Sequence, residues 1–126
     1  MNSLFAPLFA TWFVREREKD EELAARLISL CEDAWNTGKT GERDAVMRFI
    51  FFRKDETHFD LLVDGLRSAD EGIAKQAIGY VTSLVQEGFR LDPVVRDALM
   101  QFGNRFPDGR ALSEYALELL NENRAK

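Results

Sequence analysis

The 126-residue sequence contains one cysteine, one histidine and three prolines, and each shortage excludes a class of protein. A single cysteine, Cys31, allows no intrachain disulfide and is typical of a reducing compartment, so we expect a cytoplasmic protein. A single histidine, His58, excludes a metal site that needs a pair of histidines. Few prolines and no long stretch rich in glycine or serine give no sign of a flexible linker, so we expect one domain over residues 1–126.

Clustered positive charge is also missing. The chain has 17 Lys and Arg against 22 Asp and Glu, a formal net charge of −5, and no basic stripe. We therefore do not expect nucleic-acid binding, which requires positive charge facing the phosphates. An acidic chain is better suited to a basic partner protein, although mild acidity is also common among cytosolic proteins.

Long hydrophobic runs are absent as well. The most apolar stretch, Leu4 to Val14, is too short to cross a bilayer, and no Lys or Arg precedes it as in a secretory signal. Its large apolar residues recur at helical spacing as the pairs Leu4/Phe5, Leu8/Phe9 and Trp12/Phe13. We predict a helix within residues 1–19 that caps the domain and has no membrane role; a helix lying in a membrane interface is the alternative.

Signals for β-strands are nearly absent, since apolar residues recur at three- and four-residue spacing throughout the chain. Helix starts are indicated by Asp70, by Asp92 before Pro93, by Asp108, and by a capping-box pattern of Thr57 and Asp60. Helix ends are indicated by Gly38, Gly88 and Gly103. The sequence therefore predicts an all-α protein, with helices over residues 3–17, 20–36, 41–54, 57–68, 71–88, 92–103 and 109–124.

The last six of these helices form three pairs, at residues 20–55, 56–91 and 92–126, that repeat along the chain. With an offset of 36 residues, apolar residues of the first helices align in three columns: Leu23, Phe59 and Val95; Leu27, Val63 and Leu99; Leu30, Leu66 and Phe102. The second helices align less regularly, through Ala45, Ala77 and Ala116 and, four residues earlier, through Gly41, Ile73 and Leu112. Because one helical pair cannot bury its apolar stripe alone, we predict that the three pairs stack into a right-handed α-solenoid.

The segment LRSADEGIAKQAIGYVTSLVQEG, residues 66–88, resembles a HEAT repeat, and the likeness extends loosely over residues 20–126. The turn residue Asp70, the aliphatic Ile73 and Ala77 match the family's pattern, whereas Ala74 stands where HEAT repeats usually have a basic residue. The resemblance implies a HEAT-like fold whose second helices line a concave face. It also implies binding, since such solenoids are mostly scaffolds and protein-recognition modules, with a minority that bind nucleic acid or catalyse reactions.

No catalytic or cofactor motif is present, so we expect no enzyme, no cofactor and no metal. His58 lies three residues after Asp55 and two before Asp60, a spacing that could hold a metal ion on one helical turn. We prefer the interpretation that His58 lies in the first turn of a helix, where the acidic neighbours stabilise the helix N-terminus. Cys31 lies on the apolar face of its helix, which predicts a buried and unreactive thiol.

The stretch DAVMRFIFFRKD, residues 44–55, is apolar almost all the way around a helix. Either this helix is buried on every side, which we favour, or Phe51 and Phe52 emerge beside Arg48 as a protein-binding hot spot. We expect residues outside the core columns of the second helices to line the surface where a partner binds. The partner-binding candidates are Asp44, Arg48, Phe52, Lys75, Gln76, Glu114 and Glu118.

Small size, acidic charge and the lack of catalytic groups fit a protein that acts by binding another protein. We predict a small acidic inhibitor, such as an immunity protein that neutralises a basic toxin nuclease. The alternative is an adaptor or scaffold subunit of a larger assembly, and no feature of the sequence sets an oligomeric state. An inhibitor of this kind associates more slowly as salt rises, whereas a scaffold held by apolar surface depends little on salt.

Overall fold

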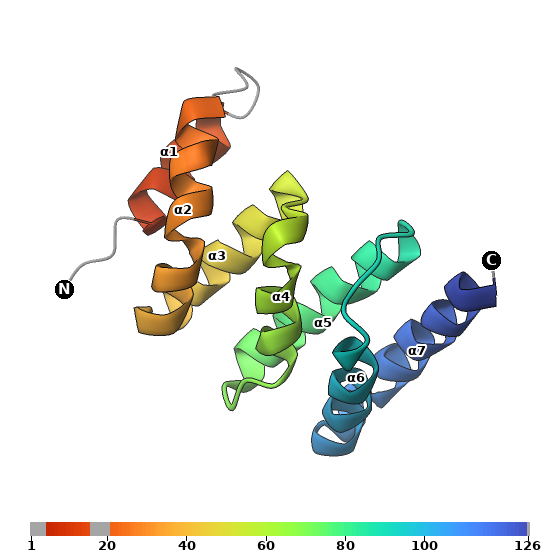
Figure 1. The fold of residues 1–126 in the computed structure, drawn as a ribbon. Coiled ribbons are helices and arrows are strands. Elements are labelled where there is room, and N and C mark those ends of the chain that lie inside the picture. The colour runs from red at the N-terminus through yellow and green to blue at the C-terminus, as the bar shows by residue number, and fades with distance from the viewer. Residues whose placement is uncertain (1–4, 16–20, 126) are drawn as a thin grey trace. The chain divides into compact units, whose positions relative to one another are not determined.

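A computed structural model of the chain describes residues 5–15 and 21–125 (Figure 1). Within these ranges there are seven α-helices and no strand, which confirms the predicted all-α class. The α-helices are α1 (Phe5–Arg15), α2 (Glu21–Thr37), α3 (Thr40–Arg53), α4 (Phe59–Leu66), α5 (Glu71–Gln86), α6 (Val94–Arg105) and α7 (Arg110–Ala125). Two short 3₁₀ helices, η2 (Glu56–His58) and η3 (Pro107–Gly109), precede α4 and α7.

The chain divides into two compact units. Unit 1, Met1–His58, contains α1, α2 and α3, and unit 2, Phe59–Lys126, contains the four remaining α-helices. The division falls just after the start of the second predicted repeat, residues 56–91. Each unit has its own buried apolar residues and its own contacts between helices.

The first helix of unit 1 docks on the other two, as its amphipathic pattern predicts. Helix α1 packs against both α2 and α3, and its Phe5 and Trp12 are buried. Both rings meet Phe49 of α3 edge-on, with centroids 5.8 Å and 5.0 Å away respectively. The predicted apolar residues Leu4, Phe13 and Val14 lie outside the residues whose side chains are described. No described helix is both long and apolar enough to cross a membrane.

The four helices of unit 2 form two pairs in contact with each other. Helix α4 packs against α5 and α6 against α7, while α4 also contacts α6 and α5 contacts α7. Side-chain hydrogen bonds join the two pairs: Lys75 Nζ donates to Asp108 Oδ2, Arg105 Nη2 to the Ser68 carbonyl, and Asn123 Nδ2 to the Val85 carbonyl. First helices therefore meet first helices, and second helices meet second helices.

The three predicted columns of the first helices form the core of both units. Eight of the nine residues are buried, and Leu30 of α2 is half-buried. In the second helices Ala45, Ala77 and Ala116 are all buried, so small residues do occupy one inner position. The column four residues earlier is wrong, because Gly41 and Leu112 are exposed and only Ile73 is buried.

The predicted caps at both ends of α5 are confirmed, Asp70 by its hydrogen bonds and Gly88 by its backbone conformation. Asp70 Oδ1 accepts from the backbone amides of Gly72 and Ile73 at the start of α5, at 2.9 Å and 3.3 Å. The amides at a helix start have no partner within the helix, and such a carboxylate satisfies them. Gly88 after α5 has a φ of 91°, a backbone conformation that glycine adopts without strain.

Two other signals have a different role from the predicted one. Gly103 does not end its helix, since α6 continues to Arg105. A Cβ atom at Gly103 would lie 3.2 Å from Ser113 Oγ, so the glycine allows α6 and α7 to approach closely. The predicted capping box is also wrong: the Thr57 hydroxyl, which lies in η2, donates to Asp55 Oδ1.

Candidate functional site

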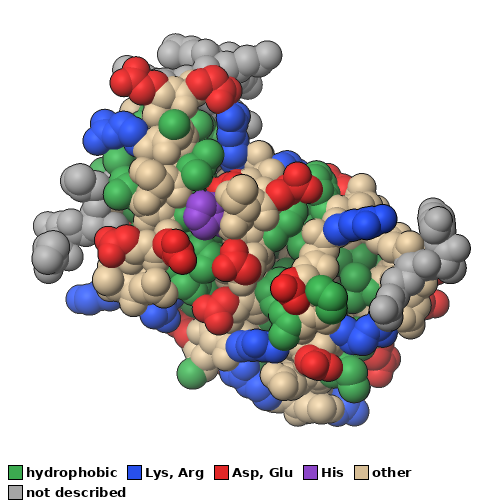
Figure 2. Space-filling model, viewed as in Figure 1, with side chains coloured by type: hydrophobic (Ala, Val, Ile, Leu, Met, Phe, Trp, Pro, Cys, Tyr) green, Lys and Arg blue, Asp and Glu red, His purple; other side chains and the backbone are tan. Residues whose placement is uncertain are grey.

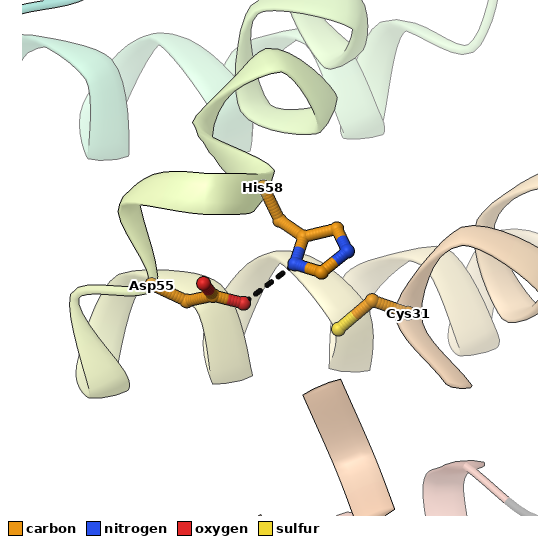
Figure 3. A group of neighbouring side chains, drawn as sticks. All are labelled: Cys31, Asp55 and His58. Carbon is orange, nitrogen blue, oxygen red and sulfur yellow. Dashed lines mark hydrogen bonds and ion pairs between the residues drawn. The ribbon is translucent and has the colours of Figure 1, made fainter. Parts of the chain in front are cut away.

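Three side chains able to bind a metal ion or transfer a proton meet inside unit 1 (Figure 3). Cys31 comes from the middle of α2, Asp55 from the turn after α3, and His58 from the end of η2. One ligand atom from each residue can be chosen so that all three lie within 4.8 Å of one another. Cys31 and Asp55 are buried, and the His58 side chain is 16% exposed. We call this group the Cys31–Asp55–His58 cluster.

The end of α3 brings Asp55 and His58 together. Lys54 adopts the left-handed conformation, with φ 57° and ψ 47°, and the Asp55 amide donates to the Ile50 carbonyl. This closure reverses the chain at the helix end and satisfies carbonyls that have no partner in the helix. The His58 amide then donates to the Asp55 carbonyl at 3.0 Å, forming a tight turn. As a result both side chains lie on one side of the turn, against α2.

Asp55 fixes the orientation of the imidazole ring. Its Oδ2 lies 2.6 Å from His58 Nδ1, and its Oδ1 accepts from the Thr57 hydroxyl. Both carboxylate oxygens are therefore hydrogen-bonded, as a buried carboxylate requires. A histidine whose Nδ1 is held by a carboxylate presents Nε2 in a defined direction, as histidines in metal and catalytic sites do.

The thiol of Cys31 is not activated by this arrangement. Burial raises the pKa of Cys31 to about 12, and the negative charge of Asp55 also raises it. Reactive cysteines have a lowered pKa and a positive neighbour, because the thiolate is the nucleophile. The predicted burial of Cys31 is confirmed, and a neutral thiol does not fit thiol-dependent hydrolysis.

We expect Cys31 to resist alkylation in the folded protein. Its pKa of about 12, against an ordinary 9.0, lowers the thiolate fraction near neutral pH by roughly a thousandfold. Iodoacetamide labelling near pH 8, followed by mass spectrometry, should therefore be slower than in denaturant by at least that factor. Since Cys31 is the only cysteine, each labelled molecule reports on this site. Similar rates in the two conditions would contradict the buried, neutral thiol.

Sequence spacing predicts two members of the cluster and misses the third. Asp60 is exposed on α4 and does not belong to it, so the trio of Asp55, His58 and Asp60 considered for a metal is wrong. Cys31 takes the third place because α2 packs against α3. The sequence places Cys31 on the apolar face of α2, but that position does not identify the residues that Cys31 contacts.

The candidate residues of unit 1 lie four residues apart on α3. Asp44 and Arg48 form an ion pair of 3.1 Å with each other, and the Arg48 side chain is 49% exposed. Phe52 is 45% exposed, so the favoured burial of this helix on every side is wrong at that residue. Phe51 is half-buried, with Lys54 Nζ 3.6 Å from its ring centroid.

Two candidates lie on α5 in unit 2, where Lys75 is engaged within its own chain. Its Nζ contacts Glu71 Oε1 at 2.9 Å and Asp108 Oδ2 at 2.6 Å. The hydrogen bond from Lys75 lowers the pKa of Asp108, while the same two acidic partners raise the pKa of Lys75. Gln76 is exposed and its side-chain oxygen accepts from the Tyr80 hydroxyl.

The last two candidates are part of a larger exposed surface on α7. Glu114 and Glu118 are exposed, and so are Tyr115, at 43%, and Glu122. The three glutamates are four residues apart, so they lie along one side of the helix. Within the described part of the chain, no Lys or Arg forms an ion pair with them. We call these four residues the α7 acidic face. Tyr115 and Glu122 were not among the candidates predicted from the sequence, although glutamates four residues apart predict an acidic side of the helix.

Charged side chains of both signs are interspersed on the face drawn in Figure 2, with hydrophobic side chains reaching the surface between them.

Comparison of the chain with models of known protein families, with characterised proteins and with solved structures finds no match. We therefore infer function from the chain's own residues.

Proposed function

We propose that this chain is a non-catalytic protein-binding module, an acidic inhibitor that neutralises a basic partner protein such as a toxin nuclease. The main support for this proposal is the α7 acidic face. It places three exposed carboxylates and one exposed tyrosine on a single helix. The net charge of −5 favours the same kind of partner.

The energetics of the α7 acidic face favour binding to positive charge. Like charges four residues apart destabilise a helix by about 0.2–0.5 kcal/mol per pair, and Glu114, Glu118 and Glu122 form two such pairs. A basic partner relieves this repulsion when it binds. Tyr115 adds an exposed aromatic ring next to Glu114, and tyrosine is among the residues enriched in binding hot spots.

We also propose how the helices are arranged: as a HEAT-like, right-handed solenoid of three helical pairs capped by α1. Two observations support it, one in each unit. In unit 2, first helices contact first helices and second helices contact second helices, the contact pattern of stacked repeats. In unit 1, α1 covers the pair formed by α2 and α3. In the proposed solenoid that pair stacks on α4 and α5 in the same way.

The test is capture of a partner by the tagged chain from a lysate of its own source, followed by binding measurements at increasing salt. We expect one basic protein at a ratio near one to one, with an association rate that falls as salt rises. The test variant is Glu114→Gln with Glu118→Gln and Glu122→Gln. The control is Glu22→Gln with Glu32→Gln and Asp33→Asn, three exposed acids of α2.

Both variants change the net charge equally, so they separate a specific face from overall charge. The α7 variant should bind about tenfold more weakly or worse, with a smaller salt dependence, while the α2 control binds like the wild type. An equal loss of affinity in the α7 variant and the α2 control would show that only the overall charge matters. Failure to capture any basic protein would count against the inhibitor.

An adaptor in a larger assembly is the second candidate, and exposed apolar side chains favour it. Phe52, Met100 and Leu112 are 45%, 52% and 40% exposed. Partners held by these residues should stay bound at high salt and be released by Phe52→Ser or Leu112→Ser. Retention of several subunits at high salt would favour the adaptor over the inhibitor.

A further inference from the structure

We infer that the Cys31–Asp55–His58 cluster binds one Zn²⁺ ion, with Cys31 Sγ, a carboxylate oxygen of Asp55 and an imidazole nitrogen of His58 as ligands. This site is separate from the α7 acidic face, since it lies in unit 1 and the face lies in unit 2. Three ligands from the chain leave a fourth tetrahedral position for water or another ligand.

The donor set selects the metal. Zn²⁺ is bound in proteins by cysteine sulfur, histidine nitrogen and carboxylate oxygen, and the cluster supplies one of each. Mg²⁺ and Ca²⁺ require a shell of oxygen ligands, which one carboxylate beside a thiol and an imidazole does not provide. A site with sulfur and nitrogen donors is soft enough for zinc and for its usual spectroscopic substitute, Co²⁺.

The geometry is close to that of a metal site. Bonds of about 2.0–2.3 Å put the ligand atoms of a tetrahedral zinc site about 3.3–3.7 Å apart. The three ligand atoms of the cluster already lie within 4.8 Å of one another, so shifts of about 1 Å bring them to a common ion. The His58 side chain is 16% exposed, which gives an ion access to the site. When the ion binds, bonds from both side chains to the metal replace the 2.6 Å contact between His58 Nδ1 and Asp55 Oδ2.

Charge balance supports a divalent ion at this position. Asp55 is buried and has no Lys or Arg among its described hydrogen-bonding partners, which are Thr57 and His58. A thiolate on Cys31 would add a second buried negative charge, which is costly without a positive partner. Zn²⁺ neutralises a carboxylate and a thiolate together. Catalysis by a free thiol fits these residues less well, because burial and the charge of Asp55 raise the pKa of Cys31.

Cobalt titration of the full-length chain tests the site directly. With Cys31 reduced, we expect one equivalent of Co²⁺ to give a thiolate-to-cobalt charge-transfer band in the near ultraviolet and the visible bands of a tetrahedral ion. Zn²⁺ should remove both. An ion held by exposed carboxylates alone gives no thiolate band, so absence of that band at saturating Co²⁺ would overturn the inference.

Variants then assign the ligands. Cys31→Ser should abolish the charge-transfer band, while His58→Gln and Asp55→Asn should each weaken Co²⁺ affinity by at least about tenfold. Asp60→Asn is the matched control, since Asp60 is an exposed carboxylate close in sequence that lies outside the cluster. Its affinity should equal that of the wild type. Wild-type affinity in His58→Gln or Asp55→Asn would overturn the assignment, and circular dichroism checks that each variant is folded.

A second measurement does not depend on spectra of the metal. A ligand that binds only the folded state raises the temperature of unfolding. Both tryptophans, Trp12 and Trp35, lie in unit 1, so their fluorescence reports the unfolding of the unit that holds the cluster. Saturating Zn²⁺ should raise this midpoint in the wild type and in Asp60→Asn but not in His58→Gln. An equal rise in all three proteins would place the ion elsewhere.

Discussion

Replacing Leu99 with alanine is expected to lower the free energy of unfolding by about 2–5 kcal/mol and to shift the unfolding midpoint of the tryptophans as well. Leu99 is fully buried in α6 of unit 2, and it belongs to a core column shared by all three helical pairs. Truncating such a side chain removes its burial and leaves a cavity. Neither tryptophan lies in unit 2, so a shift in their midpoint requires that the units unfold together.

The measurement compares denaturant unfolding followed by tryptophan fluorescence with unfolding followed by circular dichroism. In the proposed solenoid, neighbouring pairs stabilise each other, and the two midpoints fall by the same amount. Met100→Ala is the control, because Met100 is the next residue of α6 and is 52% exposed. Its effect should be small. A tryptophan midpoint that stays at the wild-type value in Leu99→Ala, while circular dichroism shows two steps, would contradict a single continuous solenoid.

Phe49→Ala should release the first helix from unit 1. The Phe49 ring is fully buried and meets Phe5 and Trp12 of α1 edge-on. Loss of a buried phenylalanine costs about 3–5 kcal/mol of stability, and here it also removes the ring that Phe5 and Trp12 of α1 contact. Trp12 should then become exposed, so its emission should move to longer wavelength.

A Trp35→Phe background isolates the emission of Trp12 for this measurement, since the chain has two tryptophans. Phe52→Ala provides the control, as Phe52 lies on the same helix with 45% of its surface exposed. The control should leave the emission maximum in place. A maximum that also stays in place in Phe49→Ala would show that α1 is held by other contacts.

Helix type and the inner columns were predictable because they depend on local periodicity. Apolar residues at helical spacing and capping residues such as Asp70 act within a few residues of each other. The predicted column of Leu27, Val63 and Leu99 is buried for the same reason: each helix must bury its apolar stripe on something.

The failures occur where a contact between helices decides the outcome. Glycine at position 103 predicted a helix end. In the structure the glycine instead makes room for Ser113 of α7, which packs closely against α6 there. Phe52 has the composition of a core residue, yet the sequence alone does not say that α3 has an exposed side there. The cluster of Cys31, Asp55 and His58 was missed for the same reason, since its third member comes from a helix whose contact with the turn no spacing encodes.

The hydrogen bonds that join the two pairs of unit 2 also bear on how quickly this unit can form. Lys75 to Asp108, Arg105 to Ser68 and Asn123 to Val85 span 33, 37 and 38 residues, close to the 36-residue repeat. Chains whose contacts are short in sequence close small loops and fold quickly, in microseconds to milliseconds for helical proteins of about this size. Each pair of unit 2 can therefore find its neighbour as soon as one repeat length of chain has formed helices, before distant segments have met.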